Sequence, residues 1–172
     1  MIALKDILNQ ITVSKSSPTT IGEILFYSNK LDKSEYPWAE RFIGPYPVPA
    51  WQRPLCWTQE QSTQLIESIL SGYDIGTYIV NDWEMTGDKK NLLSDICIDG
   101  QQRINAIVQY SQNRFRVHGR LYSELSVGDQ RRFAKTIFSK AIYTSFDEQK
   151  LKSIYNRLNF SGTNHTESQR AI

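Results

Sequence analysis

Long apolar runs are missing from this sequence of 172 residues, whose hydrophobic stretches extend over only a few residues. A transmembrane helix needs about 20 mainly apolar residues, so we expect no membrane association. A secretory signal is not expected either, because Lys5 and Asp6 lie where its apolar segment would be. The two cysteines, Cys56 and Cys97, are too few for a disulfide framework. These absences predict a soluble protein of the cytoplasm.

A strong excess of charge of one sign is also missing, since the net charge is +2. The charge is nevertheless uneven: residues 59–99 carry eight acids against two lysines, and residues 114–140 carry seven bases against two acids. Such a basic stretch is suited to bind phosphates, with Phe115, Phe133 and Phe138 stacked on bases. The alternative is a solvated helix face whose aromatic residues point into the core. We favour this alternative, because a pI of about 8.5 is below that of a dedicated nucleic-acid module.

Apolar residues make up 40% of the sequence and aromatic residues 12%, which is enough to build a hydrophobic core. The length is that of one domain, and no repeat or long linker divides it. We therefore predict a single domain over residues 1–172. Its N-terminal arm and a short helix occupy residues 1–44, and residues 45–172 form a core that carries the sequence motifs. Helical and strand patterns follow one another in irregular order, which predicts the α+β class.

Capping residues and apolar periodicity predict the secondary structure. Thr58 and Gln61 form a capping box ahead of an apolar helix face, and Gly72 ends that helix. Ser145 and Glu148 form a second capping box before the last helix. The expected helices are residues 21–29, capped by Thr20, the segments that follow Thr58, Gly100 and Ser145, and residues 127–138. The expected strands are residues 77–83, 92–98, 114–118 and 140–146, with a hairpin or loop at 85–91 and a loop at 14–20.

The most informative segment is the turn from a predicted strand into a predicted helix, Asp99-Gly100-Gln101-Gln102-Arg103. The first N–H groups of a helix have no partner within it, and together with the helix dipole they favour an anion. Gln101 and Gln102 add amide donors, and Arg103 adds a planar donor suited to phosphate. The Asp99 carboxylate is suited to hold a hydrated metal ion or to orient a water. The alternative is a purely structural turn in which Asp99 and Arg103 pair with each other.

A second polar segment lies between two tryptophans. Gln52 and Arg53 follow Trp51 and precede Trp57, so the two indoles are placed to stack around an anion held by Arg53. The alternative is that both tryptophans anchor this segment on the core while Arg53 points outward.

A third polar segment follows the last predicted helix. Gly162 is expected to end that helix in a left-handed conformation. Asn159 and Thr163 are then available to contact a ligand.

Five short patterns in a fixed order make the chain resemble a known family. They are Trp51-Gln52-Arg53-Pro54, Trp-Thr-x-Glu-Gln from Trp57, Leu-Ile-x-Ser-Ile-Leu-x-Gly-Tyr from Leu65, Asp-Gly-Gln-Gln-Arg from Asp99, and Arg-Leu-Asn-x-x-Gly-Thr from Arg157. Over residues 45–172 the chain resembles the N-terminal domain of the GmrSD-type restriction endonucleases, a branch of the ParB/sulfiredoxin-like fold. The resemblance implies a small mixed sheet with flanking helices.

The resemblance also implies a nucleotide site. Members of the family bind nucleoside triphosphates, and several hydrolyse them, through the motif that is here Asp99 to Arg103. ParB and sulfiredoxin relatives use an equivalent Gly-x-x-Arg turn for nucleotide phosphates. Asp99 and Arg103 are then the catalytic candidates, and Asp99 is the candidate ligand of Mg²⁺. The nucleotide-binding candidates are Gln52, Arg53, Gly100, Gln101, Gln102, Arg103, Asn159 and Thr163. In such proteins the domain usually serves defence against foreign or modified DNA, with nucleotide turnover coupled to a separate nuclease domain.

Several departures from the family pattern bear on the activity. His118 and His165 are the two histidines and form no His-Asn-His pattern, so we expect the family's nuclease domain to be absent. The segment Ile104-Asn105-Ala106 replaces a common Leu-Thr-Thr and removes two hydroxyls, which favours binding over hydrolysis. Sulfiredoxin chemistry needs a cysteine inside the turn that Gln101 and Gln102 occupy.

Three functions remain open. The first is a nucleotide-binding domain, with or without hydrolysis of the nucleoside triphosphate, that acts in DNA restriction or in phage counter-defence. The second is a ParB-like nuclease or DNA-binding domain guided by residues 114–140, although the sequence offers no dedicated cluster of metal ligands. The third is a non-enzymatic module that binds a host or phage defence protein. In each case we expect action in the bacterial cytoplasm, by a bacterial or a phage protein.

Overall fold

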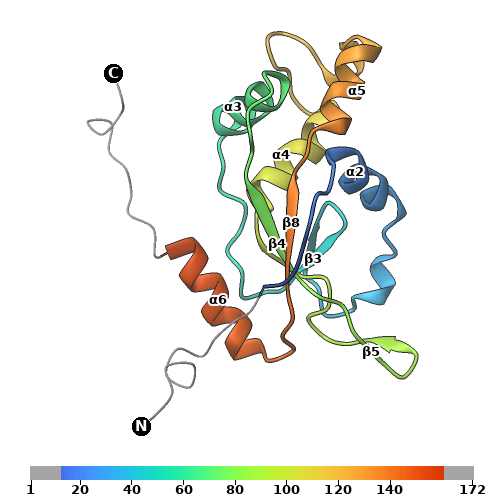
Figure 1. Ribbon diagram of the computed structural model, residues 1–172, viewed down its shortest axis with the longest axis vertical. Coiled ribbons are helices and arrows are strands. Elements are labelled where there is room, and N and C mark those ends of the chain that lie inside the picture. Colours follow the sequence, from blue (N-terminus) through green and yellow to red (C-terminus); the bar gives the residue numbers. More distant parts are fainter. Residues whose placement is uncertain (1–12, 161–172) are drawn as a thin grey trace.

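A computed structural model describes residues 13–160 (Figure 1). Its α-helices are α2 (Ile21–Lys30), α3 (Gln59–Leu70), α4 (Gln101–Ser111), α5 (Val127–Lys135) and α6 (Glu148–Phe160), and its 3-10 turns are η1 (Lys33–Glu35) and η2 (Tyr122–Glu124). Its strands are β1 (Val13–Ser17), β2 (Arg41–Ile43), β3 (Tyr46–Val48), β4 (Thr77–Asn81), β5 (Met85–Thr86), β6 (Lys89–Lys90), β7 (Cys97–Asp99) and β8 (Ser139–Tyr143). The predicted α+β class is confirmed.

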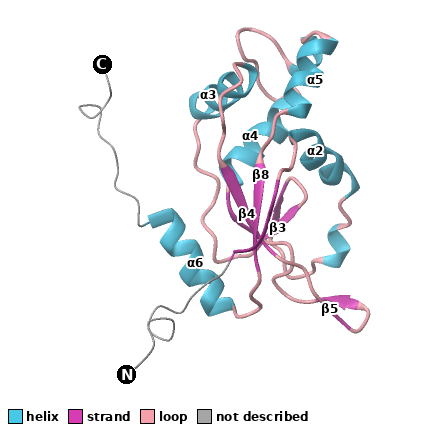
Figure 2. Cartoon of the chain, viewed as in Figure 1, coloured by secondary structure: helices cyan, strands magenta, loops and turns pink. Residues whose placement is uncertain are grey.

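The main sheet is mixed and has four strands in the order β1-β8-β4-β7. Strands β4 and β8 are parallel, and β1 and β7 pair with them antiparallel at the two edges. Strands β2 and β3 form a separate small hairpin, and β5 and β6 form another that projects from the body of the molecule (Figure 2). Strand β7 therefore lies at an edge of the main sheet and delivers its last residue, Asp99, beside Ile79 of β4.

Helices cover both faces of the main sheet. Successive side chains of a strand point to opposite faces, so neighbouring residues of β4 pack against different helices. Tyr78 and Val80 of β4 belong to the larger core cluster, which includes residues of α2, α3, α4 and α5. Ile79 of the same strand packs instead with Leu151 and Ile154 of α6 in a second cluster. Helix α6 thus lies on the other face, apart from the four helices that surround the main core (Figure 1).

Capping boxes fix the starts of two helices; the box of Thr58 and Gln61 was predicted, whereas at Thr20 only a cap was predicted. The Thr20 side chain accepts from the Glu23 N–H at the start of α2, and Glu23 in turn accepts from the Thr20 N–H at 2.7 Å. Thr58 and Gln61 make the same exchange at the start of α3. Each box satisfies N–H groups that have no partner within the helix, so these boundaries could be located from local sequence.

The structure corrects four of the expected elements. Residues 14–20 are not all loop, because Val13–Ser17 form the edge strand β1. Residues 92–96 are not strand, because Leu93 and Asp95 have positive φ angles of 70° and 59°. No strand forms over residues 114–118, where Val117 makes only an isolated bridge with Arg120. Helix α5 ends at Lys135, and the chain then joins the segment before α2 through the Phe138 N–H and the Thr19 carbonyl at 2.7 Å.

Two further findings concern α6 and the aromatic residues of the basic stretch. Asp147, not Ser145, caps α6, because its Oδ1 accepts from the Gln149 N–H at 2.9 Å. Phe133 and Phe138 are fully buried, which confirms for these two rings that they point into the core, and Phe115 is partly buried and packs against the main core. Among the described helices, none has the length and apolar character needed to cross a bilayer.

We predict that Asn81→Ala lowers the free energy of unfolding by about 3 kcal/mol, since each buried hydrogen bond contributes on the order of 1 kcal/mol. The buried Asn81 amide donates to the carbonyls of Leu93 and Ser145, and its oxygen accepts from the Ser145 N–H. It therefore joins the end of β4 to the turn before β7 and to the segment before α6. Urea unfolding measures the effect. The exposed Asn156→Ala is the control, with an expected change below about 0.5 kcal/mol, and equal losses in the two variants would contradict this role.

Candidate functional site

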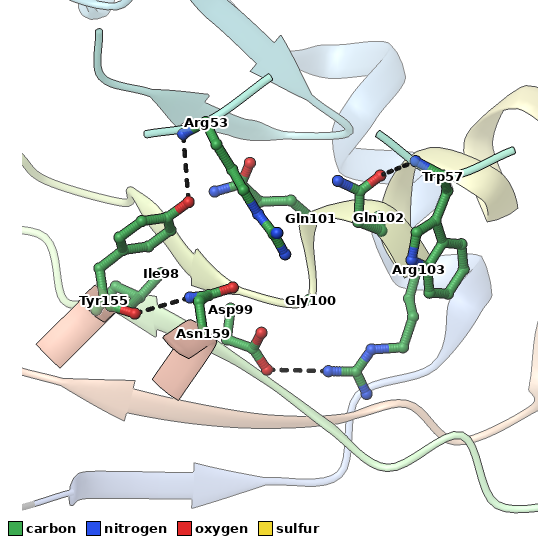
Figure 3. Close-up of a pocket in the computed structure, with 10 residues that line it drawn as sticks. All are labelled: Arg53, Trp57, Ile98, Asp99, Gly100, Gln101, Gln102, Arg103, Tyr155 and Asn159. Carbon is green, nitrogen blue, oxygen red and sulfur yellow. Dashed lines mark hydrogen bonds and ion pairs between the residues drawn. The ribbon is translucent and has the colours of Figure 1, made fainter. Parts of the chain in front are cut away.

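A pocket of about 150 Å³ lies where β7 turns into α4, between the segment that precedes α3 and the helix α6 (Figure 3). Its lining residues are Arg53, Trp57, Ile98, Asp99, Gly100, Gln101, Gln102, Arg103, Tyr155 and Asn159. Parts of the chain far apart in the sequence therefore meet here, and they include two of the polar segments that sequence analysis singled out and Asn159 of the third.

Gly100 shapes the floor of the pocket. It is the N-cap residue of α4 and has a left-handed backbone with φ of 95°, and no side chain caps the helix. A Cβ atom at this position would lie 2.5 Å from the Cβ of Tyr78 on β4. Glycine is thus required both by the backbone angle and by the close approach to β4. The first N–H groups of α4 lack partners within the helix and lie at the pocket.

The Arg103 guanidinium makes its hydrogen bonds to other groups of the protein. Its Nη1 donates to the Ile75 carbonyl at 2.7 Å, and its Nη2 donates to the Thr77 carbonyl at 2.9 Å and to Asp99 Oδ2 at 3.0 Å. The Asp99–Arg103 pair that sequence analysis gave as the structural alternative is therefore present. Arg103 ties the first turn of α4 to the chain that enters β4, and it also lines the pocket.

Gln52 lies beneath the pocket and does not line it. Its side chain is buried, and its Oε1 accepts from Gln101 Nε2, which also donates to the Cys97 carbonyl at 3.3 Å. Gln52 Nε2 has no hydrogen-bond partner among the described residues. Of the two residues expected from this segment, Gln52 supports Gln101 from below, whereas Arg53 lines the pocket.

Arg53 is carried by a segment whose backbone is held at several points. The Arg41 side chain donates to the Gln52 carbonyl at 3.0 Å, and the Arg53 N–H donates to the Tyr155 hydroxyl at 3.2 Å. Gln102 Oε1 accepts from the N–H groups of Cys56 and Trp57 at 3.3 and 3.2 Å. With its backbone fixed in this way, the Arg53 side chain extends from the segment toward Gly100 (Figure 3).

The two tryptophans of this segment have different positions. Trp51 packs against the Tyr155 ring with centroids 5.6 Å apart and belongs to the core cluster under α6, as the anchoring alternative predicts. Trp57 is half-buried and lines the pocket. Figure 3 shows it on the side of the pocket opposite Tyr155 and Asn159.

Helix α6 supplies the remaining wall. Asn159 lines the pocket as expected, and its Nδ2 donates to the Tyr155 carbonyl at 2.9 Å. Thr163, the other candidate of this segment, lies outside the described residues. Sequence analysis did not identify Tyr155 or Ile98 as pocket residues, because their apolar periodicity indicates only burial. The one sequence signal that could have identified Tyr155 is its hydroxyl, a polar atom within an apolar stripe.

The pocket has little capacity for a metal ion bound by protein alone. Asp99 is the single acid among its described lining residues, and the described part of the chain has no group of three or more His, Cys, Asp or Glu residues placed to hold a metal. Magnesium in nucleotide sites is held by one or two carboxylates together with phosphate oxygens. One carboxylate at the pocket fits that donor set, with the remaining ligands coming from phosphates and water.

Cysteine chemistry has no support at this turn. Cys97 is completely buried two residues before Asp99, and its thiol lies 3.3 Å from the Asp99 carbonyl. Burial raises the pKa of this thiol well above its usual value, so the thiolate is not formed near neutral pH. Cys97 is therefore a core residue, which agrees with its expected role as a small strand residue.

A comparison with protein families finds that residues 37–170 match the model of the GmrSD restriction endonuclease, N-terminal domain. Neither the comparison with curated proteins nor that with solved structures found a match. The matched range contains every described residue that lines the pocket.

We predict that Gly100→Ala is more destabilising than an alanine at another left-handed glycine. Gly87 has a φ of 63° and nothing within 4 Å of its would-be Cβ, so Gly87→Ala costs only the backbone strain, about 1–2 kcal/mol. Gly100→Ala adds the collision with Tyr78 and should cost roughly 2 kcal/mol more. Thermal or urea unfolding of both variants measures the difference. Similar losses of stability would contradict the prediction, because they would show that β4 shifts away from residue 100 without an energetic penalty.

Proposed function

This chain belongs to the family of GmrSD restriction endonuclease N-terminal domains, and we propose that its pocket binds the phosphates of a nucleoside triphosphate. The observation that carries the proposal is the N-terminus of α4, which no side chain caps and toward which the Arg53 side chain extends. A helix N-terminus and an arginine provide complementary donors for phosphate oxygens, the first with fixed N–H groups and the second with a planar fork. In a restriction or defence system, such a domain makes DNA restriction depend on the nucleotide.

The size and polarity of the pocket support an anionic ligand group. The volume of about 150 Å³ is smaller than the roughly 300–1,000 Å³ of pockets that enclose a drug-sized ligand, and it suits a phosphate group with bound water. The charged and amide side chains of Arg53, Gln102 and Arg103 all line it. We assign phosphate contact to Arg53 and the α4 N–H groups, with Gln102 and Asn159 beside them.

We assign Asp99 and Arg103 linked roles. Arg103 orients the Asp99 carboxylate through the 3.0 Å contact and contributes positive charge at the pocket wall. Asp99 is the residue that would hold Mg²⁺ arriving with the triphosphate. When bound, the ion neutralises phosphate charge, which favours phosphoryl transfer to water. Hydrolysis by this chain therefore depends on Asp99, whereas binding depends mainly on Arg53.

We predict that one or more of ATP, GTP, CTP and UTP, added with Mg²⁺, raises the melting temperature of the chain. A ligand at a hundred times its dissociation constant stabilises the protein by about 2.7 kcal/mol. Arg53→Ala should weaken binding by about 10- to 100-fold, because it removes a hydrogen bond to a charged group. Thermal shift and calorimetric titration measure both effects.

The control for this prediction is Arg157→Ala, an exposed arginine of α6 that does not line the pocket. Asp99→Asn tests turnover separately, since it should retain the nucleotide and lose any Mg²⁺-dependent phosphate release. If no triphosphate binds, or if Arg53→Ala binds as well as the unaltered chain, the proposal fails. The hypothesis of a module that binds a host or phage defence protein would then be favoured.

An exposed basic surface on α5 and the preceding loop supports DNA binding as a second function. Its cations are Arg114, Arg116, Arg120, Arg131, Arg132 and Lys135, all exposed. Gln130 ties the two parts together by donating to the carbonyls of Tyr122 and Leu125. The surface lies at the end of the molecule remote from α6 (Figure 1). Because the aromatic residues of this stretch are in or against the core, we propose contacts with the phosphates of duplex DNA rather than stacking on single strands.

The double variant Arg131→Ala/Arg132→Ala tests this second function. Binding of duplex DNA should become less dependent on salt, with the slope of log K against log salt reduced by about 2, since each phosphate contact contributes about 0.9. Lys33→Ala, an exposed lysine of η1, is the control and should leave the slope unchanged. An unaltered slope in the double variant would contradict a role for this surface.

A further inference from the structure

We infer that Trp57 is the stacking platform for the base of the bound nucleotide, an inference that rests on the proposed function. The pocket volume of about 150 Å³ admits a phosphate group and water but not a whole nucleotide. The base must therefore lie at the mouth of the pocket. We expect the base to lie against the wall that offers a flat side-chain face not already packed against other groups of the protein.

Among the side chains that the structure describes, the α6 wall offers no such surface. Tyr155 is 4% exposed, its ring packs edge-on against Trp51, and its hydroxyl accepts from the Arg53 N–H. Asn159 is the other described α6 side chain at the pocket, and its amide donates to the Tyr155 carbonyl. Both side chains are thus used to hold the helix and the Arg53 segment in place.

The opposite wall offers the indole of Trp57. This residue is half-buried and lines the pocket. The ring contacts among the described tryptophans involve Trp38 and Trp51, and none of them involves Trp57. A nucleobase stacks well on a tryptophan face whatever its identity, because every base has a π-face.

The position of Trp57 is fixed relative to the phosphate site. The backbone N–H of Trp57 donates to Gln102 Oε1 at 3.2 Å, and Gln102 belongs to the first turn of α4. The same helix turn therefore presents N–H groups to the phosphates and holds the backbone of the stacking residue. Such a link keeps the two subsites at a set distance before the ligand arrives, which lowers the entropic cost of binding.

The test compares ATP and UTP with inorganic tripolyphosphate, which has no base, by calorimetric titration in the same Mg²⁺ buffer. Trp57→Ala should weaken both nucleotides by about 5- to 100-fold and change tripolyphosphate affinity less than about twofold. Trp57→Phe should retain most of the nucleotide affinity. Trp83→Ala, which removes a tryptophan that is 57% exposed and does not line the pocket, is the matched control and should bind all three ligands normally.

The outcomes separate this inference from the proposed function. If the unaltered chain binds neither nucleotides nor tripolyphosphate, the proposed function fails, and this inference fails with it. If tripolyphosphate binds as tightly as ATP, or if Trp57→Ala weakens all ligands equally or none, the phosphate site stands and the stacking role is overturned.

A second measurement covers the case in which Trp57→Ala does not fold. Nucleotides, but not tripolyphosphate, should quench part of the tryptophan emission of the unaltered chain, and this part should be lost in Trp57→Phe. Quenching that persists in Trp57→Phe would overturn the inference.

Discussion

The close approach of Gly100 to Tyr78 is the contact on which the pocket depends. A side chain at residue 100 would place its Cβ 2.5 Å from the Cβ of Tyr78, so the turn from β7 into α4 forms only with glycine there. Tyr78 cannot easily move away, because its ring packs on Phe138 with centroids 4.7 Å apart and its hydroxyl bonds that of Tyr46 at 2.9 Å. The N-terminus of α4 is thereby fixed directly on the main core rather than on a surface loop.

The other walls of the pocket are fixed to this turn by glutamine side chains. Gln101 reaches down to Gln52, and Gln102 reaches across to the backbone of Cys56 and Trp57. The segment with Arg53 has no regular secondary structure, so these side chains replace the backbone pairing that a strand would have had. A buried amide pair such as Gln52–Gln101 is costly to break, because each partner would lose its hydrogen bond in a place without water. Gln101 and Gln102 therefore stabilise the fold and also line the pocket with polar groups.

Local signals predicted the parts of the fold that local chemistry determines. Thr58 and Gln61 fix the start of α3 through their own backbone neighbours, and the change from strand to helix at Gly100 is visible in the residue types. The misassigned elements depend on distant partners. Strand β1 is polar and resembles a loop until β8 pairs with it, and the apolar residue Leu93 occupies a left-handed turn held by the Asn81 side chain. For the pocket, the structure brings Arg53, Asn159 and the turn from Asp99 to Arg103 together. That Gln52 lies beneath it and Tyr155 beside it depends on packing across the sheet, which spacing along the chain does not encode.

The two arginines at the pocket illustrate why a motif does not by itself assign roles. Arg103 is part of the recognisable pattern, yet its guanidinium is bound by the Ile75 and Thr77 carbonyls and by Asp99, and it lies 5.2 Å from the centroid of the Phe138 ring. Its removal would loosen the link between α4 and β4 before any ligand is considered. Arg53 belongs to a different one of the short patterns, and its segment is held through backbone contacts with Arg41 and Tyr155. Loss of ligand affinity after a change at Arg103 would therefore mix stability with binding, whereas the backbone contact between residue 53 and Tyr155 does not depend on the Arg53 side chain.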